Sequence, residues 1–191
     1  MNTLAQRAGR SHGFTLIELM VTITVSAILL SLAVPGFTEF MDRYRLEGAV
    51  QGLYSDLQFA RSESVKSNRS VQIAFTTGNS WSYTLSSLDG ICATSALTPT
   101  ALKTSDFNGF AGTQIANVSL GCGSTTLVFQ PVSSTVQNAC ANGSPLPAGS
   151  KVVFQSSQGK QACVHINLIG RTKLCSPAGS TYLLGFPECA C

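Results

Sequence analysis

The feature that most constrains this chain is an uninterrupted apolar run near its N-terminus, Phe14–Val34. As a helix rising about 1.5 Å per residue, the run spans about 30 Å, the thickness of a bilayer's hydrocarbon core. No small-residue cleavage site of the A-x-A kind follows it, so we expect a retained transmembrane helix rather than a secretory signal peptide. Arg7 and Arg10 precede the run, which predicts a cytoplasmic N-terminus and a single pass, with the rest of the chain outside.

Glu18 is the one ionisable side chain between Phe14 and Pro35. A carboxylate within the hydrocarbon costs on the order of a few kcal/mol, so such a residue indicates a functional role with a partner still to be named. The alternative is that Glu18 lies in the headgroup layer, five residues into the span. Taken alone, the residue leaves both interpretations open.

The stretch Gly13–Phe37 reads GFTLIELMVTITVSAILLSLAVPGF and resembles the class III signal of type IV pilins and type II secretion pseudopilins. The resemblance implies that a prepilin peptidase cuts after Gly13 and methylates Phe14. It also implies that Glu18 pairs with the N-terminal amine of a neighbouring subunit during filament assembly, and that Pro35 ends the first half of the stem helix. A buried acid fits this role, because assembly supplies the compensating cation.

Beyond Pro35 the sequence predicts one more helical stretch and then strands. Apolar residues recur at spacings of three and four up to Asn68, which indicates an amphipathic helix. Alternating residues at 71–75 and 81–85, separated by TTGNS, predict a hairpin. We interpret 88–124 as a long loop with one short strand. Further strands are predicted at TTLVFQ, KVVFQS, QACVHINL, RTKLC and YLLGF. The expected fold is α+β and pilin-like: a long N-terminal helix, transmembrane in its first half, packed on an antiparallel β-sheet domain.

The segments LEGAVQGLYSDLQFARSESVKSNRSVQIAF and HINLIGRTKLC narrow the resemblance to the GspH/FimT branch of minor pilins and pseudopilins. The chain then divides into a leader (1–13), a transmembrane assembly helix (14–36), an amphipathic second half of the stem (37–68) and a β-rich head with disulfides (69–191). The implied partners are other pilins, the prepilin peptidase and an inner-membrane assembly platform. The implied location is the inner membrane, with the head in the periplasm, and then a pilus or pseudopilus.

Two uses of such a subunit stay open. In one, the chain initiates or caps a type IV pilus; in the other, it is the H-type pseudopilin of a type II secretion system. A third class, an enzyme anchored by the helix, is not supported, since no H-E-x-x-H, G-x-x-x-x-G-K-[ST] or G-x-S-x-G element is present. We therefore expect no catalytic residue and no cofactor.

Double-stranded DNA is a further candidate partner, through the stretch GRTK. In a strand leaving a turn at Gly170, Arg171 and Lys173 share a face about 6–7 Å apart, a spacing that suits successive phosphates. The resemblance adds that FimT-type pilins bind DNA through a G-R-x-R element during natural transformation. Here Lys173 replaces the second arginine, which keeps the charge and loses the planar fork. Lys151 and Lys160 would extend the patch. The alternative is an ordinary solvated hairpin. Three other cations are assigned to the solvated end of the helix: Arg61, Lys66 and Arg69.

All seven cysteines follow the apolar run, a density typical of an oxidising compartment. Cys163 and Cys175 are equidistant from Ile169, so a hairpin turning there would place them opposite each other, and we predict a Cys163–Cys175 disulfide. Cys92–Cys122 is a second candidate pair. The remaining cysteines receive no assignment: Cys140, Cys189 and Cys191.

His165 is interpreted as an ordinary strand residue, because it lies in an alternating segment. A zinc site built from His165, Cys189 and Cys191 is the competing interpretation. C-x-C is not the usual spacing of structural zinc ligands, so we predict no metal site.

Overall fold

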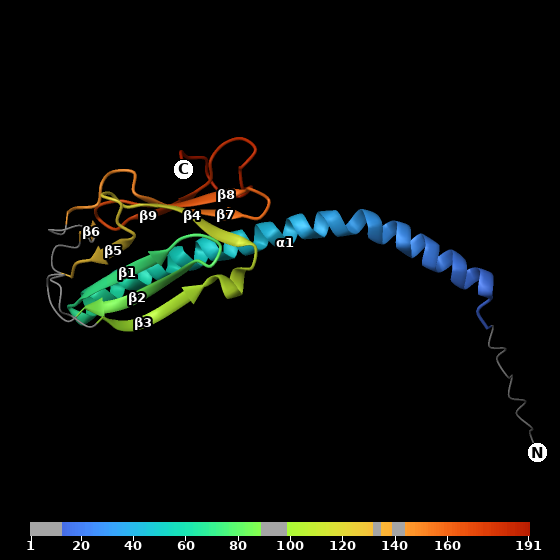
Figure 1. Ribbon diagram of the computed structural model, residues 1–191, viewed down its shortest axis with the longest axis horizontal. Coiled ribbons are helices and arrows are strands. Elements are labelled where there is room, and N and C mark those ends of the chain that lie inside the picture. Colours follow the sequence, from blue (N-terminus) through green and yellow to red (C-terminus); the bar gives the residue numbers. More distant parts are fainter. Residues whose placement is uncertain (1–12, 89–98, 132–134, 139–143) are drawn as a thin grey trace, which may run out of the picture. The chain divides into compact units, whose positions relative to one another are not determined.

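The computed structural model describes residues 13–88, 99–131, 135–138 and 144–191 (Figure 1). The chain falls into two compact units, Met1–Thr38 and Glu39–Cys191, each of which is described by itself. The elements in chain order are α1 (Leu16–Ser67), β1 (Ser70–Thr76), β2 (Ser82–Leu88), β3 (Thr100–Asp106), the 3-10 turn η1 (Phe107–Phe110), β4 (Thr113–Ser119), β5 (Thr126–Phe129), β6 (Val136–Asn138), β7 (Lys151–Ser156), β8 (Gln161–Ile166) and β9 (Thr172–Cys175).

Helix α1 ends where the sequence predicted. Asn68 adopts a left-handed backbone with φ of 53°, and the Arg69 amide donates to the Ser64 carbonyl at 3.2 Å. This pattern is a Schellman cap, in which a residue that tolerates positive φ turns the chain out of the helix and satisfies a terminal carbonyl. The chain therefore leaves the helix directly into β1.

The strands form two antiparallel sheets. One has the order β3-β2-β1-β5-β6 and the other the order β4-β7-β8-β9. The predicted hairpin is confirmed as β1 and β2, whose register runs from Ser70 opposite Leu88 to Thr76 opposite Ser82. The expected α+β fold, a long N-terminal helix followed by antiparallel sheet, is confirmed.

The core of the Glu39–Cys191 unit lies between the second half of α1 and both sheets. Figure 1 shows this half of the helix running alongside β1 and β2. The helix contributes its predicted apolar face to one buried cluster: Leu46, Ala49, Val50, Leu53, Leu57 and Ala60. Trp81 is fully buried there, stacks on Tyr83, meets Phe154 edge-on and donates its indole N–H to the Thr113 carbonyl at 3.0 Å. A single apolar helix face thus unites the two sheets.

Two predictions about the strands were wrong, and one strand was not predicted. The described part of this region, residues 99–124, contains two seven-residue strands, β3 and β4, where one short strand was expected within 88–124. Strand β3 is almost wholly exposed, so its sequence carries no alternation, and its pairing with β2 defines it. YLLGF forms turns: Tyr182 donates its amide to Gly179, while Leu183 and Phe186 reach the core. Strand β6 is three residues long, too short for a sequence pattern.

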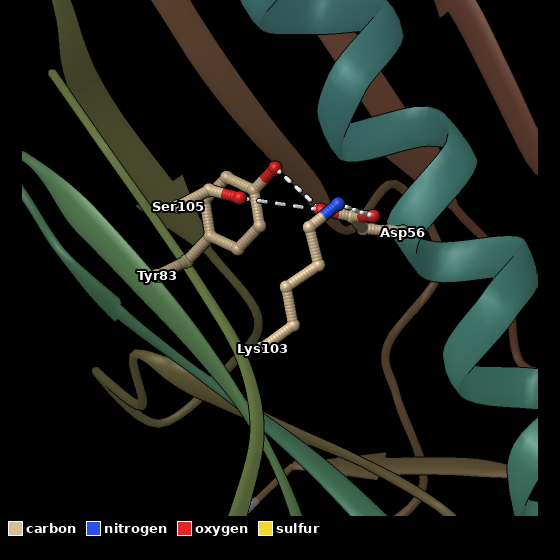
Figure 2. Close-up of polar contacts among 4 residues, drawn as sticks. All are labelled: Asp56, Tyr83, Lys103 and Ser105. Atoms are coloured by element: carbon tan, nitrogen blue, oxygen red, sulfur yellow. Dashed lines mark hydrogen bonds and ion pairs between the residues drawn. The ribbon is translucent and has the colours of Figure 1, made fainter. Parts of the chain in front are cut away.

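A buried polar cluster fastens the edge strand β3 to α1 (Figure 2). Asp56 of α1 accepts hydrogen bonds from the Tyr83 hydroxyl at 2.9 Å and the Lys103 ammonium at 2.6 Å, with Ser105 at 3.4 Å. Its side chain is 6% exposed, whereas that of Lys103 is 50% exposed. Burial raises the pKa of the Tyr83 phenol well above its usual range, so this hydroxyl stays a donor. Strand β3 contributes no residue to the apolar core, so these bonds connect its side chains to α1, while Thr104 contacts the Thr84 hydroxyl of β2 at 3.3 Å.

Candidate functional site

The first candidate site is the N-terminal end of α1. Phe14 is 81% exposed and Glu18 is exposed, in the first turn. The Thr15 hydroxyl accepts the Glu18 amide at 3.2 Å, so Thr15 is the N-cap and Glu18 the third helical residue. Thr-x-x-Glu is the capping-box pattern, and an acid in the first turn also interacts favourably with the helix dipole. The spacing predicts this cap, but the sequence analysis did not identify Thr15.

The following turns of α1 suit a lipid environment. In the part of the chain that the structure describes, α1 is the one helix long and apolar enough to cross a membrane, with a stretch of mean hydropathy 2.2. Its hydroxyl side chains donate back to carbonyls three or four residues earlier, so their polarity is satisfied within the helix: Thr22, Thr24, Ser26 and Ser31. Pro35 lies inside α1, which continues without a break to Ser67.

The second candidate site is the β8–β9 hairpin, which turns where the sequence predicted. The Gly170 amide donates to the Asn167 carbonyl at 2.9 Å, and the Asn167 amide donates to the Arg171 carbonyl at 3.0 Å. The Asn167 side chain accepts the Arg171 amide at 2.7 Å. Gly170 has φ of 70°, and a Cβ there would lie 3.2 Å from Phe129 and Val136. Glycine is therefore required both by the backbone conformation and by the close approach.

The two cations of this hairpin share a face. Arg171 and Lys173 are exposed, while Thr172 between them is partly buried and its hydroxyl accepts from Gln58 of α1 at 2.6 Å. Arg61, one helical turn further on, also lies beside the turn: its guanidinium is 3.5 Å from the position of a Cβ on Gly170. Sequence reasoning missed this proximity, because Arg61 and Gly170 are 109 positions apart and only the packing of α1 on the sheet brings them together.

Of the two lysines expected to extend the patch, the structure brings in Lys151 and not Lys160. Lys151, His165 and Lys173 are directly opposed across β7, β8 and β9, so their side chains share one face and the outer two lie about 10 Å apart. Lys160 occupies the turn at the opposite end of β8, about 20 Å along the strand, and donates to the Ser180 carbonyl at 3.3 Å.

His165 lies in the middle of this row. Burial lowers its pKa, and the neighbouring charge of Lys151 adds to the shift. Its Nε2 atom is buried and has no hydrogen-bond partner among the described residues. A buried unpaired nitrogen is uncommon and calls for a physical explanation.

The C-terminal residues cross the same face of β8 and β9. Disulfides join Cys163 to Cys191 and Cys175 to Cys189. The Cys189 amide also donates to the Ser176 carbonyl. These sulfurs pack against Val153 of β7 in a small second cluster. The tail is thus fixed on the outer face of the four-stranded sheet, opposite the core.

The predicted Cys163–Cys175 disulfide is therefore wrong, although the two residues are indeed directly opposed. The Asn167 amide donates to the Arg171 carbonyl, just before β9, and the Ile166 amide donates to the Ser150 carbonyl, just before β7. Hydrogen-bonded and non-hydrogen-bonded pairs alternate along an antiparallel ladder. Asn167 and Arg171 form a hydrogen-bonded pair, so Cys163 and Cys175, four residues further along each strand, form one too. The Cβ atoms of such pairs lie further apart than a disulfide favours, so each cysteine bonds to the tail above.

The second predicted pair, Cys92–Cys122, falls partly outside the described residues, as does Cys140. Within the described residues Cys122 is a free, exposed cysteine in a turn where its backbone has φ of 49°. The Asn138 side chain approaches its sulfur at 3.8 Å.

Two family models match the chain. Type II transport protein GspH matches residues 49–170, and the prokaryotic N-terminal methylation motif matches residues 9–34. Among curated proteins, the type IV major pilin protein PilA of Myxococcus xanthus (strain DK1622) is 34% identical over 89 residues, which cover 44% of this chain. The chain spans 40% of the length of that pilin.

Among solved structures, the chain is similar to the type IV minor pilin FimU of Pseudomonas aeruginosa (strain PAO1) in two crystal forms. The first has a TM-score of 0.47 and 20% identity, and covers 75% of this chain and 99% of that one. The second has a TM-score of 0.43 and 18% identity, and covers 71% and 99%. The GspH model spans more than half of the chain and the methylation motif precedes it, so the chain belongs to the GspH family of minor pilins and pseudopilins, structural subunits anchored by an apolar N-terminal helix.

Proposed function

We propose that this chain is a filament subunit that initiates or caps a type IV pilus after cleavage between Gly13 and Phe14. The observation that carries the proposal is Glu18, the one ionisable side chain of an apolar run otherwise suited to lipid. A carboxylate at that depth is costly until a cation meets it. Removal of the leader creates such a cation, the amine of Phe14, on every subunit.

In this proposal Thr15 and Glu18 act together. The Thr15 cap holds the first turn of α1 closed, so Glu18 projects from an ordered helix rather than a frayed end. The carboxylate then pairs with the amine of a neighbouring subunit. Within the apolar centre of a filament, an unpaired charge costs far more than a paired one, so Glu18 selects the correct axial register.

The test is incorporation of a Glu18→Val variant into filaments. Valine keeps the helix apolar, so membrane insertion is expected to be unchanged, whereas the sheared filament fraction should lose the protein. Glu39→Gln, which neutralises an exposed acid further along α1, is the matched control and should enter filaments normally. Normal incorporation of the Glu18→Val protein would overturn the pairing mechanism.

The proposal also assigns a place and partners to the chain. The N-terminus lies in the cytoplasm and the head in the periplasm, in keeping with Arg7 and Arg10 before the apolar run. The prepilin peptidase removes residues 1–13, and an inner-membrane platform extracts the subunit into the filament. Residues 14–36 then form the assembly helix, 37–68 the second half of the stem, and 69–191 the head.

The alternative is the H-type pseudopilin of a type II secretion system, which the description of the matched family favours. The match to a major pilin favours a pilus. Deletion of the gene separates the two: loss of surface pili with intact protein secretion supports the pilus, and the reverse result supports the secretion system.

A second function, binding of double-stranded DNA, is favoured by the exposed cations of the β8–β9 hairpin. Arg171 and Lys173 share a face, Lys151 lies in the same cross-strand row, and Gly170 shapes the turn before them. Each phosphate neutralised by a cation contributes about 0.9 to the slope of log K against log salt. Three cations therefore predict weak binding with a slope of about 3 and little sequence preference.

The experiment is a mobility shift of duplex DNA by the full chain in detergent at low salt. The Arg171→Glu/Lys173→Glu double variant should abolish the shift. Lys160→Glu is the control, because it reverses a charge at the far end of β8, away from the hairpin. This variant should retain most of the binding. No shift with the unaltered protein, or an unchanged shift with the double variant, would refute DNA binding.

A further inference from the structure

The turn of the β8–β9 hairpin presents two exposed aliphatic side chains. The Gly170 amide donates to the Asn167 carbonyl, so Leu168 and Ile169 are the two central residues of a β-turn. Leu168 is 41% exposed and Ile169 is 51% exposed, and neither belongs to the apolar core. Central turn positions usually hold glycine, proline, asparagine, aspartate or serine. An adjacent leucine and isoleucine at these positions therefore serve no purpose inside the head.

The backbone of this turn is fixed against the head. The Leu168 carbonyl accepts the Val136 amide at 2.8 Å. Gly170 lies so close to Phe129 and Val136 that a Cβ on it would be 3.2 Å from each. The two aliphatic side chains are therefore presented to solvent from a short turn that is held down on the surface.

Cations surround the turn. Arg171 follows it directly and is exposed, as is Lys173 on the same face. Arg61 of α1 reaches the other side of the chain, with its guanidinium 3.5 Å from the position of a Cβ on Gly170, and no ion pair to a carboxylate holds it among the described residues. The sequence has no aspartate or glutamate anywhere in 108–187. The aliphatic pair thus lies within a positively charged surface.

We propose that this turn binds the surface of an anionic phospholipid bilayer. Leu168 and Ile169 enter the boundary between headgroups and acyl chains, while Arg61, Arg171 and Lys173 meet the lipid phosphates. The phosphates of DNA need the cations alone, so the aliphatic pair favours lipid as the partner. A turn held down on the head also suits shallow insertion. This inference does not rest on the proposed role in a filament or on DNA binding.

The two kinds of side chain make separate contributions to the affinity. Each basic residue close to an anionic membrane strengthens binding about fivefold. Each half-exposed aliphatic side chain that enters the apolar boundary strengthens it by about the same factor. Binding should therefore require both the aliphatic pair and the cations, and vesicles without anionic lipid should bind weakly.

The experiment uses the full chain, inserted by α1 into nanodiscs of phosphatidylcholine whose scaffold protein carries a fluorescent label. Acceptor vesicles contain phosphatidylcholine with or without phosphatidylglycerol and are floated on a density gradient. Flotation of the scaffold label reports binding by the head, because a chain that merely moved into the vesicles would leave the scaffold behind. We expect flotation with the phosphatidylglycerol vesicles, and background flotation with neutral vesicles or with empty discs.

The contribution of the aliphatic pair is tested by removing it. Leu168→Ser/Ile169→Ser should weaken vesicle binding about twentyfold, and Ile169→Ser alone about fivefold. Both variants should shift duplex DNA like the unaltered chain. Leu184→Ser, which changes a leucine that is 63% exposed in another turn, is the matched control and should bind vesicles normally. Emission from Trp81, the single tryptophan, reports whether each head is folded.

The contribution of the cations is tested in the same assay. Arg171→Glu/Lys173→Glu should abolish vesicle binding, and Arg61→Gln should weaken it about fivefold. Lys160→Glu, at the far end of β8, is the control and should bind normally.

Several results would overturn the proposal. These are background flotation with the phosphatidylglycerol vesicles, equal flotation with neutral and anionic vesicles, and unchanged binding in either double variant. If the unaltered chain does not float and Leu168→Ser/Ile169→Ser loses the DNA shift, the aliphatic pair contacts DNA and not lipid.

Discussion

The cluster around Asp56 makes a quantitative prediction about the stability of the head. Replacing Lys103 by Met removes the charge-assisted hydrogen bond but leaves a carboxylate that is 6% exposed. A buried carboxylate without its cation loses the bond and keeps its desolvation cost. Because the Lys103 side chain is half exposed, water and salt already screen part of the attraction. We expect a loss of about 3 kcal/mol in the free energy of unfolding.

The reverse change should cost less. In an Asp56→Asn protein the amide oxygen still accepts from the Tyr83 hydroxyl, and Lys103 can turn into water, so we expect about 1.5 kcal/mol. The double variant leaves no buried charge and should cost about 2 kcal/mol, well below the sum of the single changes. The coupling free energy is then about 2.5 kcal/mol, within the range for residues in direct contact.

Urea unfolding of the full chain in detergent, followed by Trp81 emission, measures all four proteins. Trp81 is fully buried and stacks on Tyr83, so its signal reports the packing beside the cluster. Lys66→Met, which removes an exposed lysine in the last turn of α1, is the control and should cost no more than about 0.5 kcal/mol through the lost interaction with the helix dipole. Additive losses in the double variant would refute the conclusion that Asp56 depends on Lys103.

Three further predictions follow from single residues. Gly170→Ala should cost about 2–3 kcal/mol in unfolding free energy, because positive φ and contacts at 3.2 Å act together, whereas Gly159→Ala, with positive φ in open space, should cost about 1 kcal/mol; equal losses would contradict this. Because the pKa of His165 is lowered in the folded protein, the unfolded chain binds more protons below about pH 6.5, and the free energy of unfolding should fall as pH drops through that value. His165→Gln should flatten this dependence of the unfolding free energy on pH, and an unchanged dependence would refute the prediction. Thr15→Ala should remove the N-cap, lower the stability of the first helical turn by about 1 kcal/mol and speed hydrogen exchange of the Glu18 amide. Thr22→Ala should leave that exchange unchanged, and slow exchange in both variants would contradict the cap.

Elements with a local sequence pattern, such as one apolar face or a turn residue, could be predicted from the sequence. The apolar face of α1, its end at Asn68, the β1–β2 hairpin and the β8–β9 turn at Gly170 each have local patterns, and each is found. Strand β3 could not be predicted, because nearly all its side chains are exposed and long-range pairing alone defines it. The segment YLLGF was predicted as a strand because its composition is apolar. It forms turns instead, and its apolar side chains Leu183 and Phe186 are buried in the core.

The candidate sites divide in the same way. Gly13, Phe14 and Glu18 lie in one contiguous motif, so the sequence alone is enough to propose their roles. The predicted Cys163–Cys175 disulfide was wrong because cross-strand opposition does not say whether a pair is hydrogen-bonded, and that depends on the turn at Asn167. The position of Arg61 beside Gly170 and the bonds of Asp56 to Lys103 depend on how α1 packs, which no local pattern encodes.

The most direct test of the central proposal, a processed filament subunit, is the intact mass of the chain recovered from sheared surface filaments. We predict a polypeptide whose first residue is Phe14 and whose N-terminal amine carries one added methyl group. Recovery of a chain that still begins at Met1, or its presence in membranes but never in the filament fraction of either a pilus or a pseudopilus, would contradict the proposal.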